Sequence, residues 1–232
     1  MNDAAQPPSA PLPTKIVQIE GRPAVTVRYA VPGDAEQVAG LYVAGEKLAY
    51  SPYAPKRYID LIAPDVAGWK EQIERPKDFV YAAEAEGKLI GFANGGLAEP
   101  GYGVLADTWV EAGWHRTGVS YVLAEQVIEH LRLAGATFVE AAVLLQNEYG
   151  DRFCKGLGLE YKGRRKILWL HGRWPLPDLI GEFGFWRKPL VDEAAVPAAA
   201  AQAAEAAPQP AEQTEEAAPD PANGGLGESV RR

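Results

Sequence analysis

Residues 108–123 carry the pattern that decides the fold and read Thr108-Trp109-Val110-Glu111-Ala112-Gly113-Trp114-His115-Arg116-Thr117-Gly118-Val119-Ser120-Tyr121-Val122-Leu123. A β-rich segment ends, a short loop follows, and apolar residues then recur at helical spacing. The first N–H groups of a helix lack partners within it, and the helix dipole adds positive charge there. The stretch therefore predicts a strand-loop-helix unit whose helix start can bind an anion, a property that many such units share. Gly118 would let the backbone approach this anion closely, and Arg116 would add a positive charge.

The flanking residues predict further strands and helices in regular order. Downstream, the helix runs from Gly118 to about residue 134, and an apolar strand at 138–145, a short helix at 148–157 and strands at about 159–170 and 180–187 follow. Upstream, residues 25–30 form a strand, and Asp34 caps a helix that runs to about Lys47. Residues 50–76 predict a loop and one or two helices, residues 79–85 and 88–93 a hairpin, and residues 103–110 a strand.

This order of elements predicts an α/β (α+β) fold. A helix between two extended apolar strands implies a right-handed parallel crossover, whereas the hairpins imply antiparallel neighbours. We therefore expect a mixed, mostly antiparallel central sheet of six to seven strands, flanked by helices on both faces.

Composition divides the chain of 232 residues into one domain and two tails. Residues 1–22 lack periodicity and predict a disordered arm, and residues 23–191 form the domain. Residues 192–232, rich in Ala, Pro and Glu, predict a disordered tail. This tail carries eight acidic and two basic residues, so it accounts for most of the net charge of −8. The nearly neutral domain gives no support for binding nucleic acid by bulk charge.

Several other classes of function find no support in the sequence. Cys154 is the one cysteine, which excludes an intramolecular disulfide and fits a reducing compartment. The sequence shows no signal pattern and no apolar run of roughly 20 residues, so we expect a cytoplasmic protein without membrane contact. The three histidines lack metal-ligand spacing, so we expect no metal site.

A second motif follows the strand at 138–145 and reads Asn147-Glu148-Tyr149-Gly150-Asp151-Arg152-Phe153-Cys154-Lys155-Gly156-Leu157-Gly158-Leu159. With both motifs the chain resembles the GNAT N-acetyltransferase superfamily over about residues 25–190. The family's loop, Gln/Arg-x-x-Gly-x-Gly/Ala, is matched by His115, Gly118 and Ser120. Its second motif is matched by Asn147, by Phe153-Cys154 and by Gly158-Leu159. The predicted order of strands and helices agrees with the family throughout.

The resemblance implies a site for acetyl-CoA between the ends of two splayed strands. The N–H of Val110 would polarise the thioester carbonyl. Backbone amides from about Arg116 to Tyr121 would hold the pyrophosphate, and Asn147 would contact the pantetheine arm. The residues implied to bind the cosubstrate are Trp109, Val110, His115, Arg116, Thr117, Gly118, Val119, Ser120, Tyr121 and Asn147.

The resemblance also implies that an amine attacks the acetyl group directly, so the amine must lose a proton. Asp107 is our first candidate for the acceptor of this proton and Glu140 the second, although each could instead be structurally paired. Cys154 stands where many family members have the tyrosine that protonates the leaving thiolate. The Cys154 thiol could take that role or could simply pack as a small apolar residue.

Three functional hypotheses therefore remain. The first is an acetyl-CoA-dependent N-acyltransferase acting on the amine of a small molecule or peptide, as a monomer or homodimer. The second is a GNAT-fold protein that binds acyl-CoA without turnover, which the departures at Cys154 and in the loop motivate. The third is an unrelated α/β domain. In family members the segment equivalent to residues 48–60 binds the acceptor.

Overall fold

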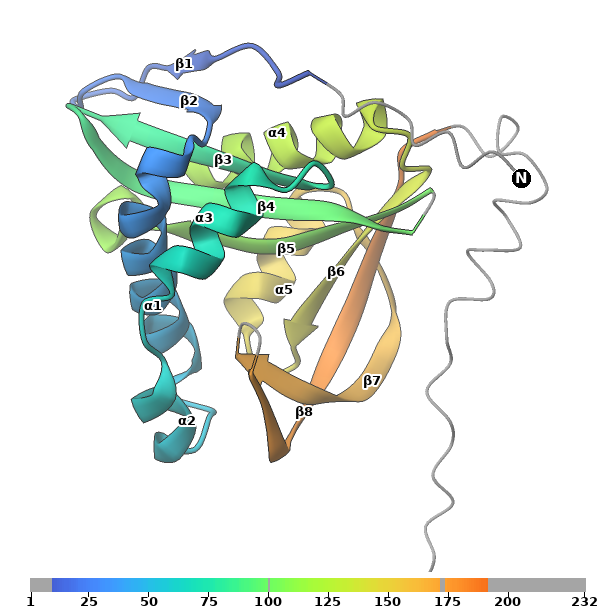
Figure 1. Ribbon diagram of the computed structural model, residues 1–232. Coiled ribbons are helices and arrows are strands. Elements are labelled where there is room, and N and C mark those ends of the chain that lie inside the picture. Colours follow the sequence, from blue (N-terminus) through green and yellow to red (C-terminus); the bar gives the residue numbers. More distant parts are fainter. Residues whose placement is uncertain (1–9, 100, 172–173, 192–232) are drawn as a thin grey trace, which may run out of the picture.

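The computed structural model describes residues 10–99, 101–171 and 174–191, without the side chains of residues 167–180 (Figure 1). The chain forms an eight-stranded sheet in the order β1-β2-β3-β4-β5-β6-β8-β7. The strands are β1 (Lys15–Val17), β2 (Val25–Tyr29), β3 (Asp78–Ala85), β4 (Lys88–Glu99), β5 (Tyr102–Val110), β6 (Phe138–Leu144), β7 (Glu160–His171) and β8 (Trp174–Pro189). The helices are α1 (Ala35–Tyr50), α2 (Lys56–Leu61), α3 (Val66–Glu74), α4 (Val119–Leu133) and α5 (Glu148–Gly156), with short 3-10 turns at Pro32–Asp34 and Ala112–Trp114.

The predicted fold class is confirmed, and the number of strands is the main difference. Within the described residues β5 and β6 pair in parallel, and the other neighbouring strands pair antiparallel. The eighth strand is β1, which lies in the segment expected to be a disordered arm and pairs with β2. Three residues are too few to show a strand period in the sequence. The tail predicted at residues 192–232 lies outside the described residues.

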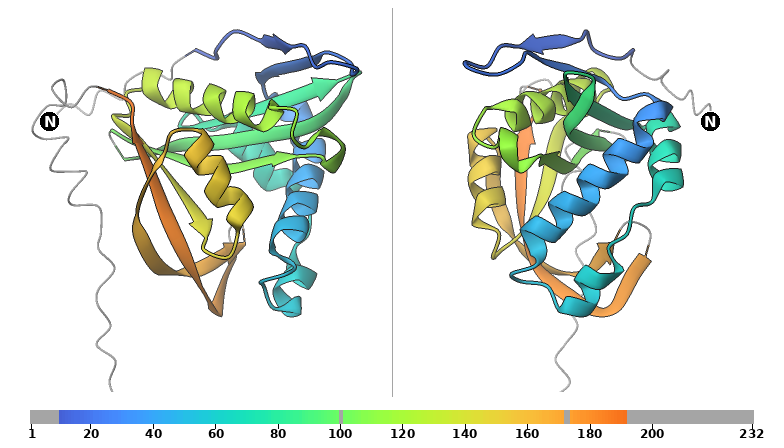
Figure 2. Two further views of the ribbon diagram at one scale, coloured as in Figure 1. Left: turned by 180° about the vertical axis from the view of Figure 1, so that it is seen from behind. Right: turned by 90° about the vertical axis from the view of Figure 1, so that its left-hand side faces the viewer.

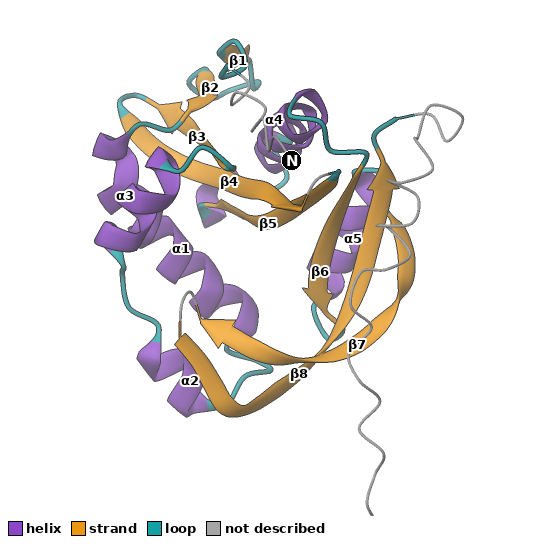
Figure 3. Ribbon diagram, turned by 45° about the vertical axis from the view of Figure 1, so that its right-hand side comes forward, coloured by secondary structure: helices purple, strands orange, loops and turns teal. Residues whose placement is uncertain are grey.

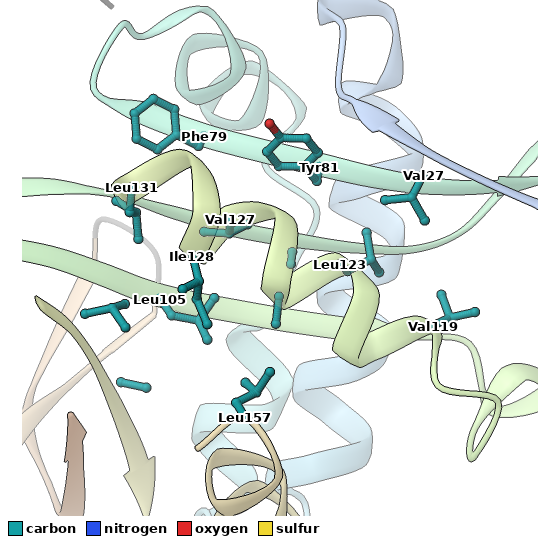
Figure 4. Close-up of a cluster of buried hydrophobic side chains, with 14 of the residues drawn as sticks. Val27, Phe79, Tyr81, Leu105, Val119, Leu123, Val127, Ile128, Leu131 and Leu157 are labelled. Atoms are coloured by element: carbon teal, nitrogen blue, oxygen red, sulfur yellow. The ribbon is translucent and has the colours of Figure 1, made fainter. Parts of the chain in front are cut away.

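Helices cover both faces of the sheet, as expected (Figure 2). Alternate side chains of β3 point to opposite faces, so Phe79 and Tyr81 join one apolar cluster with α4, and Val80 and Ala82 join another with α1 and α3. Figure 4 shows α4 placing Leu123, among others, over the sheet. Burial on both faces explains why β3 is almost continuously apolar rather than alternating. None of the described helices is long and apolar enough to cross a membrane.

The two halves of the sheet are joined by a short pairing between β5 and β6. The register contains only Tyr102↔Phe138, Gly103↔Val139 and Val104↔Glu140. Beyond these pairs β5 continues along β4 as far as Val110, and β6 continues along β8 as far as Leu144. The strands therefore splay apart, and Figure 3 shows the resulting V between β5 and β6.

A buried ion pair lies at the closed end of this V. Arg187 Nη2 donates to Glu140 Oε2 at 2.8 Å, and Tyr102 Oη donates to Glu140 Oε1 at 2.7 Å. The side chain of Glu140 is 5% exposed and that of Arg187 is 21% exposed. Three strands, β5, β6 and β8, are thus tied together where the splay begins.

This ion pair predicts a large effect of removing one partner. Arg187→Met would leave the Glu140 carboxylate buried without its charge partner, at a cost of about 3–5 kcal/mol in the free energy of unfolding. Adding Glu140→Gln removes the uncompensated charge and should recover most of that loss. Urea unfolding of both variants tests this, and a single variant within about 0.5 kcal/mol of wild type would contradict it.

Candidate functional site

A cavity of about 480 Å³ fills the space between the splayed strands. Residues from β5 and β6 form its middle, and α4, α5 and α1 contribute the rest of the wall. Because α4 and α5 lie on one face of the sheet and α1 on the other, the cavity reaches from one face to the other. Its lining residues are Leu48, Ala49, Tyr50, Pro52, Tyr53, Leu105, Ala106, Asp107, Thr108, Trp109, Val110, His115, Ser120, Ala141, Ala142, Val143, Asn147, Glu148, Tyr149, Gly150, Arg152, Phe153 and Cys154.

The loop before α4 has the backbone geometry of an anion site. Arg116 (φ 63°) and Gly118 (φ 86°) both adopt the left-handed conformation, which Gly118 tolerates without steric cost. The N–H groups of Tyr121 and Val122 donate to the Gly118 carbonyl oxygen. In the described part of the chain, no backbone hydrogen bond uses the N–H groups at positions 118–120, and no side chain caps the helix. These groups can therefore bind a phosphate.

The remaining residues of the predicted loop site have other surroundings. Thr117 Oγ1 donates to the Trp114 carbonyl oxygen at 2.7 Å, and Val119 is fully buried in the core. The Tyr121 ring packs against Phe153, with 5.0 Å between ring centroids. Of the loop residues, His115 and Ser120 line the cavity. A phosphate would thus contact mainly the backbone of this loop.

Val110 presents its backbone N–H to the splay. The N–H of the next residue, Glu111, donates to the Ile90 carbonyl oxygen on β4. Successive N–H groups of a strand point to opposite sides, so that of Val110 points away from β4 and toward β6. On the same side, His115 Nε2 lies 2.9 Å from the Val110 carbonyl oxygen, so this ring nitrogen carries the donated proton. The exposed side chain of His115 therefore folds back onto the strand end.

Asn147 and Cys154 place α5 against the cavity. The Asn147 side chain accepts a hydrogen bond from the Gly150 N–H at 3.0 Å and so caps α5. Cys154, about two turns further on, is 2% exposed. Burial, and secondarily the charge of Asp151, raise the pKa of its thiol to about 12. A thiol with so high a pKa is a poor proton donor to an ordinary thiolate, whose pKa is about 8.5. This favours the packing interpretation of Cys154.

Asp107 lies in the cavity wall on β5, at the level of the splay. Its own N–H donates to Asn94 Oδ1 at 3.0 Å. Burial raises the pKa of its carboxyl group to about 6, although the side chains of Asn94 and Trp109 lower it in part. This value suits a group that accepts a proton near neutral pH. Glu140, the second predicted acceptor, does not line the cavity and is held by Arg187 and Tyr102, so we no longer assign it this role.

Sequence reasoning missed a second buried carboxyl group, Glu46 on α1. It is 5% exposed and accepts a hydrogen bond from Tyr58 Oη at 2.8 Å. Burial, and then the charge of Asp107, raise the pKa of Glu46 to about 8. Tyr42, Glu46 and Tyr50 are spaced four residues apart and share one helix face. Burial also raises the pKa values of the two tyrosines, and the charge of Asp107 adds to this. An acid on the apolar face of a helix was the signal available in the sequence.

Several basic residues of α5 and β7 pair with neighbouring acids. Among them, Lys155 pairs with Asp151 and Lys162 with Glu160, each at 2.8 Å. Arg164 lies 3.4 Å from Glu182. In the described part of the chain no group of three or more His, Cys, Asp or Glu side chains is placed to hold a metal ion.

The model of the acetyltransferase (GNAT) family matches residues 46–159 of the chain, a segment that includes α1's buried acid, the splayed strands and α5. The chain belongs to the GNAT family. No curated protein sequence matches it significantly.

Solved structures support the same fold for this GNAT protein. YncA from Salmonella typhimurium, solved with its cofactor acetyl-CoA, is 19% identical with a TM-score of 0.58, covering 75% of this chain and 98% of that one. The PaiA N-acetyltransferase from Thermoplasma acidophilum, in complex with coenzyme A, is 15% identical with a TM-score of 0.57, covering 71% and 98%. The ribosomal-protein-alanine N-acetyltransferase from Brucella melitensis is 21% identical with a TM-score of 0.55, covering 70% and 98%.

Two glycines of α1 provide a matched test of the cavity wall in this GNAT domain. A Cβ atom at Gly45 would overlap the Trp109 ring, whereas Gly40 has open space around it. Gly40→Ala should stabilise the protein by about 0.5–1 kcal/mol through helix propensity. Gly45→Ala should instead destabilise it by about 1–3 kcal/mol, because the rigid indole has to shift. Urea unfolding measures both, and equal stabilisation by the two changes would contradict the packing of α1 on Trp109.

Glu46 predicts a distinctive dependence of stability on pH. The folded pKa of about 8 exceeds the ordinary value of 4.5, so the folded state holds a proton that the unfolded state releases. The free energy of unfolding should therefore fall as pH rises from about 4.5 to about 8, by roughly 3–5 kcal/mol from this residue.

Glu46→Gln keeps an acceptor for Tyr58 Oη and should remove most of that decline, so that the variant exceeds wild type in stability at pH 8. Glu36→Gln, at an exposed position of the same helix, is the control and should leave the decline intact. Urea unfolding between pH 5 and pH 9 tests this. Identical pH profiles for Glu46→Gln and wild type would show that Glu46 ionises normally.

Proposed function

We propose that the protein is an acetyl-CoA-dependent N-acetyltransferase that transfers an acetyl group to the amine of a small molecule or peptide by direct attack. The observation that carries the proposal is one cavity that is lined both by the uncapped start of α4 and by the carboxyl group of Asp107. The helix start at residues 118–120 supplies the anion site, and Asp107 is the proton acceptor. Family membership supports the same chemistry.

The residues fit acetyl-CoA at both ends of its reactive arm. The N–H groups at 118–120 would hold the pyrophosphate, which gains from the positive end of α4. The walls of β5 and β6 would flank the pantetheine arm, and Asn147 lies beside its path. The Val110 N–H, directed into the splay, would donate to the thioester carbonyl oxygen and favour charge on that oxygen.

When bound, acetyl-CoA supplies a thioester that a neutral amine converts to an amide and a free CoA thiol. The protein's part is to take a proton from the ammonium form of the amine, and Asp107 would accept it at its carboxylate. Since buried Cys154 holds its own proton tightly, we assign it no transfer, and the proton released from the amine nitrogen during attack can reach the thiolate directly or through water. The start of α4 and the Val110 N–H are already placed to contact the pyrophosphate and the thioester carbonyl oxygen, so neither has to rearrange.

The buried cysteine also favours one alternative, a GNAT-fold protein that binds acyl-CoA without turnover. The two hypotheses differ in a single assay. Release of CoA thiol that depends on an added amine supports the enzyme, whereas saturable binding of acetyl-CoA without thiol release with any amine supports the alternative.

The pKa of Asp107 predicts the pH dependence of the reaction. Only the ionised carboxylate accepts a proton, so kcat/KM for a given amine should rise about tenfold per pH unit below pH 6. Above pH 6 the ionisation of Asp107 should no longer change kcat/KM. Asp107→Asn should lower kcat/KM by about 10²–10⁴-fold and abolish the limb near pH 6.

Calorimetric titration provides the control for this variant. Asp107→Asn should bind acetyl-CoA within about twofold of wild type, since Asp107 is not among the phosphate-binding groups. Full activity of Asp107→Asn with an unchanged pH profile would remove Asp107 from the mechanism.

A further inference from the structure

The end of the cavity at α1 exposes large apolar side chains. Leu48 is 62% exposed and Tyr53 is 45% exposed, and both line the cavity with Ala49, Tyr50 and Pro52. Exposed apolar groups gathered in a cavity wall are typical of a site for an apolar ligand. This wall lies across the sheet from the start of α4, at the end of the cavity opposite the helix start.

Aromatic rings continue this wall toward Asp107. Tyr50 meets Trp109 edge to face, with 6.2 Å between the ring centroids. Trp109 rests on α1 at Gly45, where the missing side chain leaves room for its ring. Such rings favour contact with another aromatic ring and with an ammonium group. A ligand beside them would place its ammonium near the Asp107 carboxylate.

The charges in the wall are unevenly distributed. Two acids line the cavity, Asp107 on β5 and Glu148 on α5, and the buried Glu46 lies near Asp107. The two basic residues of the lining, His115 and Arg152, lie with α4 and α5 on the other face. Among the side chains that the structure describes, the wall at α1 contains no lysine or arginine. A substrate carboxylate near the amine would lie close to the Asp107 carboxylate, and two like charges at such a distance repel each other.

The helix α2 packs against the second half of the sheet. Tyr58 and Ile62 pack with Leu144 and Phe183 in a separate apolar cluster. Figure 3 shows α2 beside β8, consistent with this contact. A peptide that extends past α2 would meet these packed side chains, which favours a compact acceptor.

From these features we infer that the acceptor is a compact primary amine with an aromatic or apolar body and without a carboxylate beside the amine, an arylalkylamine in chemical terms. The inference rests on the proposed function, because it names the acceptor of that reaction. The apolar body would lie on Leu48, Tyr50 and Tyr53, and the ammonium would lie between Trp109 and Asp107.

A matched pair of amines tests this inference. 2-Phenylethylamine and phenylalanine differ by one carboxylate, and spermidine and a peptide with an N-terminal alanine represent the polyamine and peptide classes. In a thiol-release assay with acetyl-CoA, kcat/KM for 2-phenylethylamine should exceed that for each of the others by at least about tenfold. Equal or better use of phenylalanine, spermidine or the peptide would overturn the inference.

A charge introduced into the wall should change this preference. Leu48→Arg supplies a partner for a carboxylate and should reduce the ratio of kcat/KM between 2-phenylethylamine and phenylalanine by at least about fivefold. Leu61→Arg, at a position that is 57% exposed on α2 and absent from the cavity wall, is the control and should leave the ratio unchanged. An unchanged ratio for Leu48→Arg would contradict the placement of the acceptor.

Calorimetric titration of both amines into the CoA-loaded protein separates failure of this inference from failure of the proposed function. If 2-phenylethylamine binds, phenylalanine does not and no thiol is released, the acceptor site stands and the proposed catalysis is wrong. If phenylalanine binds as tightly as 2-phenylethylamine, or neither amine binds, the inference is wrong even where another amine releases thiol.

Discussion

The early end of pairing between β5 and β6 is the constraint on which the rest of the structure depends. After Val104 and Glu140 each strand follows a different partner, so one half of the sheet is fixed by β4 and the other by β8. The backbone groups at the end of β5 that point away from β4 therefore have no strand to pair with. The ion pair of Glu140 and Arg187 fixes the point of divergence, and the cavity begins just beyond it.

The two faces of the sheet supply different chemistry to this opening. On one face the start of α4 offers backbone N–H groups and a positive dipole end. On the other face α1 offers aromatic rings and a buried acid, whose charge is coupled to that of Asp107. Burial raises the pKa values of both carboxyl groups, and the charge of Asp107 adds to the rise for Glu46. The split sheet thus brings the start of α4 and the carboxyl group of Asp107 to one cavity.

Local patterns predicted much of this, and the remainder depends on contacts that are distant in sequence. The strand-loop-helix unit around Gly118 was predictable because its glycine, its apolar period and its helix start lie within a few residues. Asp107 was predictable from its place just before a strand end. The burial of Glu46 was not predictable, because it arises where α1 meets β5 and α2. The ion pair of Glu140 was not predictable from local sequence because its partner Arg187 lies 47 residues away. Strand β1 was missed because only its pairing with β2 defines it.

We propose that acetyl-CoA binds in the splay between β5 and β6, and a crystal structure of the protein with bound coenzyme A tests this. The pyrophosphate should lie on the N–H groups at 118–120, and the sulfur atom should lie between Val110 and β6, within reach of Asp107. Coenzyme A bound elsewhere, or a pyrophosphate that does not contact the start of α4, would contradict it.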